Sequence, residues 1–225
     1  MARIVDSLGR VDENSGYARL FGNDRLGKLF SRVQAAVIRS GNELEDLLWQ
    51  ATPYKARLED ILDRDKRLVS EQQGIFVVSA KKIAEYNRTV PRTDLLILDD
   101  GRDDLSVVEL KDGDTFDTKK ADGELESAKT FTAWITPQVN VSVKYYFCSF
   151  NQSDKAAIVK GIKGRFALDQ VMTGRELCER IGVDYDAIRF ARQRDQVENR
   201  EFFIKELLAI LEIKELVQLY FENAE

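Results

Sequence analysis

The chain has 225 residues, of which 44% are hydrophobic and 32% charged, a composition typical of one soluble globular domain. It contains no histidine, which excludes Ser-His-Asp triads, histidine-dependent nucleases and zinc sites with histidine ligands. No apolar run is long enough to span a bilayer, and Cys148 and Cys178 lie in apolar contexts, so we expect a reduced, cytoplasmic protein without membrane association.

The net charge of −5 is distributed unevenly along the chain. Acidic residues outnumber basic ones in residues 41–114, whereas basic residues outnumber acidic ones in residues 117–165. An acidic region that holds a cation beside a basic region is compatible with a nucleic-acid partner.

The first fifty residues predict an arm followed by two helices. Residues 1–22 are interrupted by glycine and weakly patterned, which predicts an arm or loop. From Asn23 the apolar residues recur at helical spacing, and Ser40-Gly41 is expected to end that helix. A second helix is expected from Asn42. In it, Glu45 is either a functional acid or the partner of Asn42 in a capping box.

The centre of the chain predicts a hairpin. Residues 53–72 read as a charged helix and residues 74–79 as a strand. Residues 95–98 and 105–110 are short apolar runs on either side of an Asp100-Gly101 turn signal. Two such runs around an Asp-Gly pair are the sequence pattern of a β-hairpin.

A hairpin that is symmetric about Gly101 and Arg102 places Asp94 opposite Glu109. Directly opposed residues have Cβ atoms about 4.5–5.5 Å apart, and two like charges there destabilise a sheet. A divalent cation would compensate this repulsion. Because side chains alternate along a strand, Lys111 projects on the same face as Glu109. Two carboxylates, a cation and a lysine are the parts of a site that hydrolyses phosphodiesters.

The polar stretch after the hairpin, residues 111–124, predicts a loop. It leaves the strand that carries Glu109 where a substrate would lie. Lys119 and Lys120 are therefore candidate phosphate contacts, with a solvated turn as the alternative.

A helix over residues 124–136, a strand over 140–150 and a helix from Ser153 are expected next. Asn151 and Gln152 lie where the strand ends. Such side chains suit adenine edges in the major groove, and they also commonly close turns.

The last third predicts helices. Thr173 and Glu176 form a capping-box pattern, and Asp195 with Glu198 repeats it before a long helix over residues 197–221. That helix is more apolar than one buried stripe requires, so it is either deeply packed or shared with a second subunit. It also contains Glu-x-Lys at residues 212–214, but residues two apart on a helix point about 200° away from each other, so this match is rejected.

The hairpin over residues 92–120 resembles the catalytic hairpin of the PD-(D/E)xK nucleases, most closely that of type II restriction endonucleases. Asp94 and Glu109-Leu110-Lys111 fill the motif, with Thr93 at the position of its proline. Helix, strand and helix then follow in the order of the family core. The spacing of Gly41 and Glu45 also resembles the glutamate that members place beside the metal.

The resemblance implies a single α/β nuclease domain over residues 1–225, with a central mixed β-sheet flanked by helices. It implies that Asp94, Glu109 and the Leu110 carbonyl hold Mg²⁺, for which Mn²⁺ can substitute. Lys111 would position and help to deprotonate the attacking water, with Glu45 as a further acid.

The substrate implied is double-stranded DNA, cut by a homodimer to leave 5′-phosphates. The helical C-terminal part, residues 166–225, is a candidate for dimerisation or DNA recognition. Two alternatives remain open: a structure-specific or repair nuclease of the same superfamily, and a catalytically inert DNA-binding module.

Overall fold

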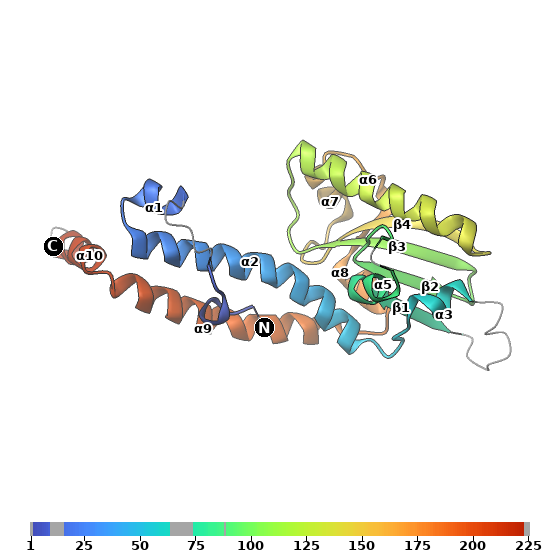
Figure 1. The fold of residues 1–225 in the computed structure, drawn as a ribbon, viewed down its shortest axis with the longest axis horizontal. Coiled ribbons are helices and arrows are strands. Elements are labelled where there is room, and N and C mark those ends of the chain that lie inside the picture. Colours follow the sequence, from blue (N-terminus) through green and yellow to red (C-terminus); the bar gives the residue numbers. More distant parts are fainter. Residues whose placement is uncertain (1, 10–15, 64–73, 88, 223–225) are drawn as a thin grey trace. The chain divides into compact units, whose positions relative to one another are not determined.

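The computed structural model describes residues 2–9, 16–63, 74–87 and 89–222 (Figure 1). No helix in these ranges is long and apolar enough to cross a membrane. The expected charged helix over residues 53–72 appears as the short helix α3, and residues 64–72 of that prediction lie outside the described residues. The elements in chain order are η1 (Ile4–Asp6), α1 (Gly16–Phe21), α2 (Asp24–Ala51), α3 (Leu58–Leu62), β1 (Ile75–Ser79), α5 (Ala80–Tyr86), β2 (Leu95–Asp99), β3 (Asp104–Lys111), α6 (Thr118–Ile135), η2 (Thr136–Gln138), β4 (Ser142–Ser149), α7 (Lys155–Gly161), η3 (Leu168–Gln170), β5 (Val171–Thr173), α8 (Gly174–Arg180), α9 (Tyr185–Leu208) and α10 (Leu211–Glu222).

The described strands form one five-stranded mixed sheet in the order β1-β2-β3-β4-β5. The pairs β1/β2 and β2/β3 are antiparallel, whereas β3/β4 and β4/β5 are parallel. The parallel pair β3/β4 is connected through α6, as a parallel connection requires a crossover. This arrangement confirms the expected mixed sheet flanked by helices. The three-residue strand β5 was not expected.

The hairpin has the predicted register. Leu95 pairs with Val108 and Asp99 with Asp104, so every pair sums to 203. The turn between the strands places Asp103 at a positive φ of 50°. Extending the same register by one residue sets Asp94 opposite Glu109.

One face of the sheet packs against α6. Leu96, Leu98, Leu105 and Val107 alternate onto this face and form a buried cluster with Phe131 and other residues of α3, α5 and α6. A second cluster joins α6 to α7 around Phe147 and Phe166. The helices are held to the sheet by buried apolar area, at about 25 cal/mol per Å². Because Glu109 and Lys111 follow Leu105 and Val107 by steps of two, they project on the α6 face.

Helix α2 is continuous over Asp24–Ala51, so the predicted break at Ser40-Gly41 is wrong. Asn23 does cap this helix, because its side-chain oxygen accepts a hydrogen bond from the Leu26 amide at 2.9 Å. A single glycine costs a helix only about 1 kcal/mol, which burial of the neighbouring apolar face offsets. Glu45 therefore lies inside a helix, and the capping-box interpretation of Asn42 and Glu45 is also wrong.

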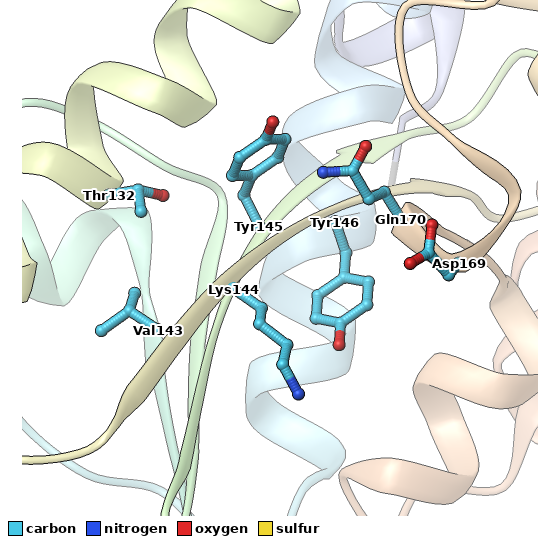
Figure 2. Close-up of a pocket in the computed structure, with 7 residues that line it drawn as sticks. All are labelled: Thr132, Val143, Lys144, Tyr145, Tyr146, Asp169 and Gln170. Carbon is cyan, nitrogen blue, oxygen red and sulfur yellow. The ribbon is translucent and has the colours of Figure 1, made fainter.

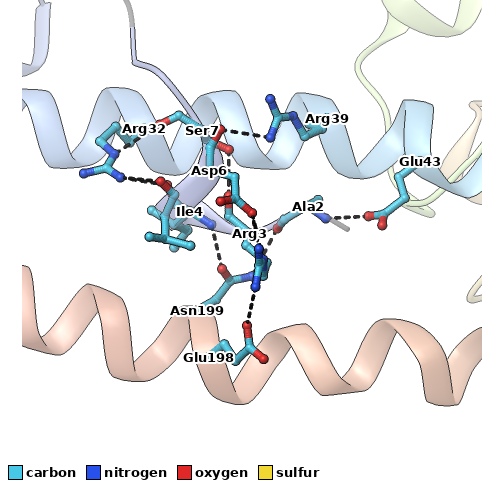
Figure 3. A network of polar contacts seen from close by, with 11 residues as sticks. Ala2, Arg3, Ile4, Asp6, Ser7, Arg32, Arg39, Glu43, Glu198 and Asn199 are labelled. Carbon is cyan, nitrogen blue, oxygen red and sulfur yellow. Dashed lines mark hydrogen bonds and ion pairs between the residues drawn. The ribbon is translucent and has the colours of Figure 1, made fainter.

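The chain divides into two compact units, residues 1–43 with 186–225 and residues 44–185. In the first unit, the N-terminal segment is tied to α2 and α9 (Figure 3). Ala2 donates its backbone N–H to the Glu43 carboxylate at 2.7 Å, and Ile4 donates to the Asn199 side-chain oxygen at 2.7 Å. Arg32 donates to three carbonyls of residues 4–7. The expectation of an arm or loop over residues 1–22 is therefore only partly right, because residues 16–21 are helical and residues 2–7 are anchored.

The expected helix over residues 197–221 is two helices, α9 and α10, which are separated at Ala209 and Ile210. Asp195 lies within α9 with 7% of its surface exposed, so its expected role as a helix cap is wrong. The expected capping box of Thr173 and Glu176 is present at the start of α8.

Candidate active site

Asp94, Glu109 and Lys111 come together at the end of the β2–β3 hairpin. The backbone of Asp94 is fixed because its carbonyl accepts a hydrogen bond from the Ala80 amide at 2.9 Å. Its carboxylate accepts a second hydrogen bond, from the Leu110 amide at 2.7 Å. The Asp94 side chain is thereby held against the third strand.

Thr93 supports the same junction. Its buried hydroxyl donates to the Val108 carbonyl at 3.0 Å, which continues the contact between the strands beyond their last paired residues. Thr93 therefore has a structural role of its own at this junction.

The Lys111 ammonium lies among three carboxylates. It forms ion pairs with Glu109, with Asp94 at 3.4 Å and with Glu124 at 3.3 Å. The Glu109 side chain is only 8% exposed, and that of Lys111 22% exposed. Ion pairs this far from water are screened much less than surface pairs.

Glu124 was not among the predicted site residues, because the stretch that contains it was expected to be a loop. Helix α6 instead begins at Thr118, after Asp117 accepts a hydrogen bond from the Lys120 amide at 2.8 Å. Glu124 follows the buried Ala121 by three residues and precedes the buried Ala128 by four, so it lies on the buried face of α6. An acid on the apolar face of a helix directly after the active-site strand is the signal that could have identified it.

Glu45 reaches the same cluster from α2. Its carboxyl group lies near Asp94, whose charge helps to raise the pKa of Glu45. The structure thus brings the predicted residues Glu45, Asp94, Glu109 and Lys111 together and adds Glu124.

The pKa values in this cluster reflect an excess of carboxyl groups over cations. Burial, and then the charge of Asp94, raise the pKa of Glu109 to about 9, and the same two causes raise the pKa of Glu45 to about 8. Burial alone would lower the pKa of Lys111, but the charges of Glu109 and Asp94 outweigh it and raise that pKa above its ordinary value. At neutral pH without a metal, the lysine is therefore charged, and the raised pKa values favour protonated Glu45 and Glu109.

The donor set fits a magnesium ion. Mg²⁺ is commonly held by one or two carboxylates together with water, so Asp94 and Glu109 suffice, and the cluster already surrounds a cation, the Lys111 ammonium. The N–H and C=O of one strand residue point to the same edge of the strand, so the Leu110 carbonyl faces the same side as its amide, toward Asp94. Within the described ranges, no three acidic or cysteine side chains form a ready-made metal cage.

The sequence is 39% identical to the type II restriction enzyme HhaII of Haemophilus parahaemolyticus in an alignment 227 positions long. The alignment covers 98% of this chain and 100% of that protein. The chain is a type II restriction endonuclease. It is therefore a hydrolase of a restriction-modification system. No family model matches the sequence, and no solved structure matches the fold.

The residues of the restriction endonuclease that were predicted to contact DNA flank the same end of the sheet. Lys119 and Lys120 lie in the first turn of α6. The Asn151 amide donates to the Asp112 backbone and side chain, at 2.9 and 2.6 Å, and the Gln152 amide donates to Asp114 at 3.1 Å. The two amides hold the segment that follows β3.

A separate cavity of about 460 Å³ opens in the restriction endonuclease beside the first half of β4 (Figure 2). Strand β5 pairs only with Phe147–Ser149, so this cavity adjoins the part of β4 that β5 does not cover. Figure 2 shows Tyr145 and Tyr146 directed to opposite sides of the strand. The cavity is lined by Thr132, Val143, Lys144, Tyr145, Tyr146, Asp169 and Gln170, and the acidic cluster takes no part in it.

Proposed function

We propose that this restriction endonuclease uses a PD-(D/E)xK site to hydrolyse phosphodiesters of double-stranded DNA. The observation that carries the proposal is the position of the Lys111 ammonium between the carboxylates of Asp94 and Glu109, which adjacent strands present on one face. This is the arrangement that the resemblance implies. It also holds a fixed positive charge beside two potential metal ligands.

We assign Asp94, Glu109 and the Leu110 carbonyl to Mg²⁺, with Mn²⁺ as a substitute. All of these donors are oxygens, which hard divalent cations prefer. When bound, the ion supplies positive charge that offsets the charge of the phosphate. The protein's part is to hold the two carboxylates in place, which Asp94 achieves through its bonds to Ala80 and Leu110.

Lys111 orients the attacking water and stabilises charge on the phosphate. Its raised pKa keeps the proton on the lysine at neutral pH, so we assign these two roles ahead of proton abstraction. The water gives up a proton to the surrounding solvent as its oxygen bonds to phosphorus. The bond from phosphorus to the 3′-oxygen breaks, and the 3′-oxygen takes up a proton. The products are a 5′-phosphate and a 3′-hydroxyl. Glu45, which contacts Asp94, is a further acid of the site.

DNA contacts are assigned to the residues around this end of the sheet. Lys119 and Lys120 would bind backbone phosphates, which position the duplex without reading its sequence. Asn151 and Gln152 would exchange their bonds to Asp112 and Asp114 for base edges when DNA binds.

A homodimer would place one active site on each strand of a two-fold symmetric target. Support comes from the first compact unit, where α9 and α10 expose large apolar side chains. Apolar patches that are large and exposed mark interaction sites. The exposed residues of these two helices are Phe190, Val197, Ile204, Leu208, Leu211, Leu216, Leu219, Tyr220 and Phe221.

Digestion of a long plasmid tests this proposal against its alternatives. A restriction enzyme yields discrete bands, and end sequencing should find 5′-phosphates. Cleavage of branched DNA alone would indicate a structure-specific nuclease, and DNA binding without cleavage would indicate an inert module.

The metal dependence of cleavage is a second test. A chelator should stop cleavage, and Mg²⁺ or Mn²⁺ should restore it. Ca²⁺ should support DNA binding only, because its looser coordination holds the phosphate without ordering the water. Full cleavage in excess chelator would refute the metal site.

A further inference from the structure

Among the described residues that form ion pairs with Lys111, Glu124 is the one that does not come from the catalytic hairpin. It reaches the ammonium at 3.3 Å from α6, and its side chain is 16% exposed. It also lies beside the Glu109 carboxyl and helps to raise the pKa of that group. An acid on the buried face of a helix gains nothing for the helix itself, since the same position filled by an apolar residue would avoid the cost of desolvation.

The three carboxylates around Lys111 differ in what they can do when a divalent cation arrives. Asp94 and Glu109 are the proposed ligands of that cation, so their charge is then directed to it. A divalent cation beside Lys111 also repels the ammonium, and at short range in a partly buried site that repulsion is weakly screened. Two of the three ion pairs that hold Lys111 are thus weakened when the site is loaded. The pair with Glu124 remains.

We propose that Glu124 is a positioning residue that keeps the Lys111 ammonium in place when Asp94 and Glu109 bind the divalent cation. This inference rests on the proposed function, because it assumes that those two carboxylates are the ligands. Its physical content is orientation: a lysine side chain has four rotatable bonds and a flexible stem, so its ammonium needs a fixed anion to stay directed at the phosphate. A displacement of about 1 Å in a reacting group can cost 10²-fold in rate.

Two other roles for Glu124 predict different behaviour. As a third metal ligand, Glu124 would strengthen cation binding by the enzyme without DNA. As a purely structural residue, Glu124 would change stability and leave the cleavage step unaffected. The geometry favours positioning because Glu124 forms an ion pair with the ammonium at 3.3 Å.

The test compares Glu124→Gln and Glu124→Asp with Glu126→Gln. Glu126 is the matched control, because it is an exposed acid on the same helix. It lies two residues after Glu124, so its side chain points about 200° away from that of Glu124. Glu124→Gln should lower the single-turnover cleavage rate about 10- to 100-fold, the usual effect of losing a partner that orients an active-site group. Glu124→Asp should recover part of that loss, and Glu126→Gln should cleave like the wild type.

Binding by Glu124→Gln should change little. Its DNA dissociation constant in Ca²⁺ and its Ca²⁺ affinity without DNA should each stay within about threefold of wild type, which is the signature of a role outside ground-state binding.

A second measurement does not depend on activity. A double-mutant cycle of Glu124→Gln and Lys111→Met, followed by the shift in Tm, should give a coupling that persists in saturating Ca²⁺. The corresponding cycle of Asp94→Asn and Lys111→Met should give a coupling that shrinks in Ca²⁺. Loss of the Glu124 coupling in Ca²⁺ would overturn the inference.

The inference is also overturned if Glu124→Gln cleaves DNA at the wild-type rate. It is overturned as well if the Ca²⁺ affinity of Glu124→Gln falls tenfold or more, because Glu124 would then be a ligand. These outcomes differ from failure of the proposed function. If the wild type cleaves DNA without a divalent cation, the proposed function fails. If the wild type requires Mg²⁺ and Glu124→Gln matches it, only the role of Glu124 fails.

Discussion

Glu109→Gln should flatten the dependence of stability on pH when divalent cations are absent. Burial, and then the charge of Asp94, raise the pKa of the Glu109 carboxyl to about 9 from an ordinary value of 4.5. Between these two values the folded state holds a proton that the unfolded chain has released. The free energy of unfolding therefore falls as pH rises through this window, until the folded pKa is passed.

The size of the effect follows from one proton. A difference of one bound proton changes the free energy of unfolding by about 1.4 kcal/mol per pH unit. Between about pH 5.5 and 7.5, the wild type should lose roughly 2–3 kcal/mol more than Glu109→Gln, allowing for the shared protons of a coupled cluster. Glu45, whose pKa is raised to about 8, is present in both proteins, so its contribution largely cancels in the difference.

Urea unfolding in the presence of a chelator, followed by circular dichroism at three pH values, measures this slope. The slope is informative even though the substitution also removes the contact with Lys111. That loss shifts the whole curve rather than its dependence on pH, because the raised pKa of Lys111 keeps the lysine charged throughout. Glu126→Gln, which removes an exposed acid from α6, should keep the wild-type slope. Parallel pH profiles for the wild type and Glu109→Gln would refute the argument that this carboxyl is protonated in the metal-free fold.

Three further predictions follow from the site and its supports. Asp94→Asn and Lys111→Ala should each abolish cleavage in gel assays, whereas Glu212→Gln should cleave normally. Asp94→Asn should bind DNA as well as the wild type or better, because a negative charge near the phosphates is removed. Normal cleavage by Asp94→Asn would refute its role. Gly161→Ala should destabilise the fold by about 1–3 kcal/mol, because the new Cβ would meet the Asp114 carbonyl oxygen at 1.7 Å. Gly123→Ala should be neutral or stabilising in thermal unfolding, because no atom lies within 4 Å of its new Cβ. Equal Tm values for the two variants would contradict this prediction. Light scattering should report a mass near twice 25.7 kDa, and a monomer with and without DNA would exclude the proposed dimer.

The hairpin and its register were predictable because both depend on local features. An Asp-Gly turn between two apolar runs fixes where the strands reverse, and strict alternation then fixes which side chains share a face. Leu95 pairs with Val108 as the symmetric hairpin required. The junction of Asp94 with Glu109 and Lys111 follows from that register alone.

Local patterns were misleading where tertiary contacts outweighed them. Ser40-Gly41 reads as a helix end, yet α2 continues through it to Ala51. Asp195 and Glu198 read as a capping box, yet Asp195 lies buried within α9. Propensities and caps are worth about 1 kcal/mol each, which is less than the burial of one large apolar side chain, about 1.5–3 kcal/mol.

The sequence by itself determined which residues of the hairpin come together, and only the tertiary structure decided which further groups reach them. Glu45 and Glu124 lie 49 residues before Asp94 and 13 residues after Lys111, on helices whose buried faces depend on what each helix packs against. No short-range pattern encodes that choice, because a helix can present any acid to solvent at little cost. Packing of Ala121, Ala128 and Phe131 against the sheet sets the rotation of α6, and that rotation brings the Glu124 carboxylate to Lys111.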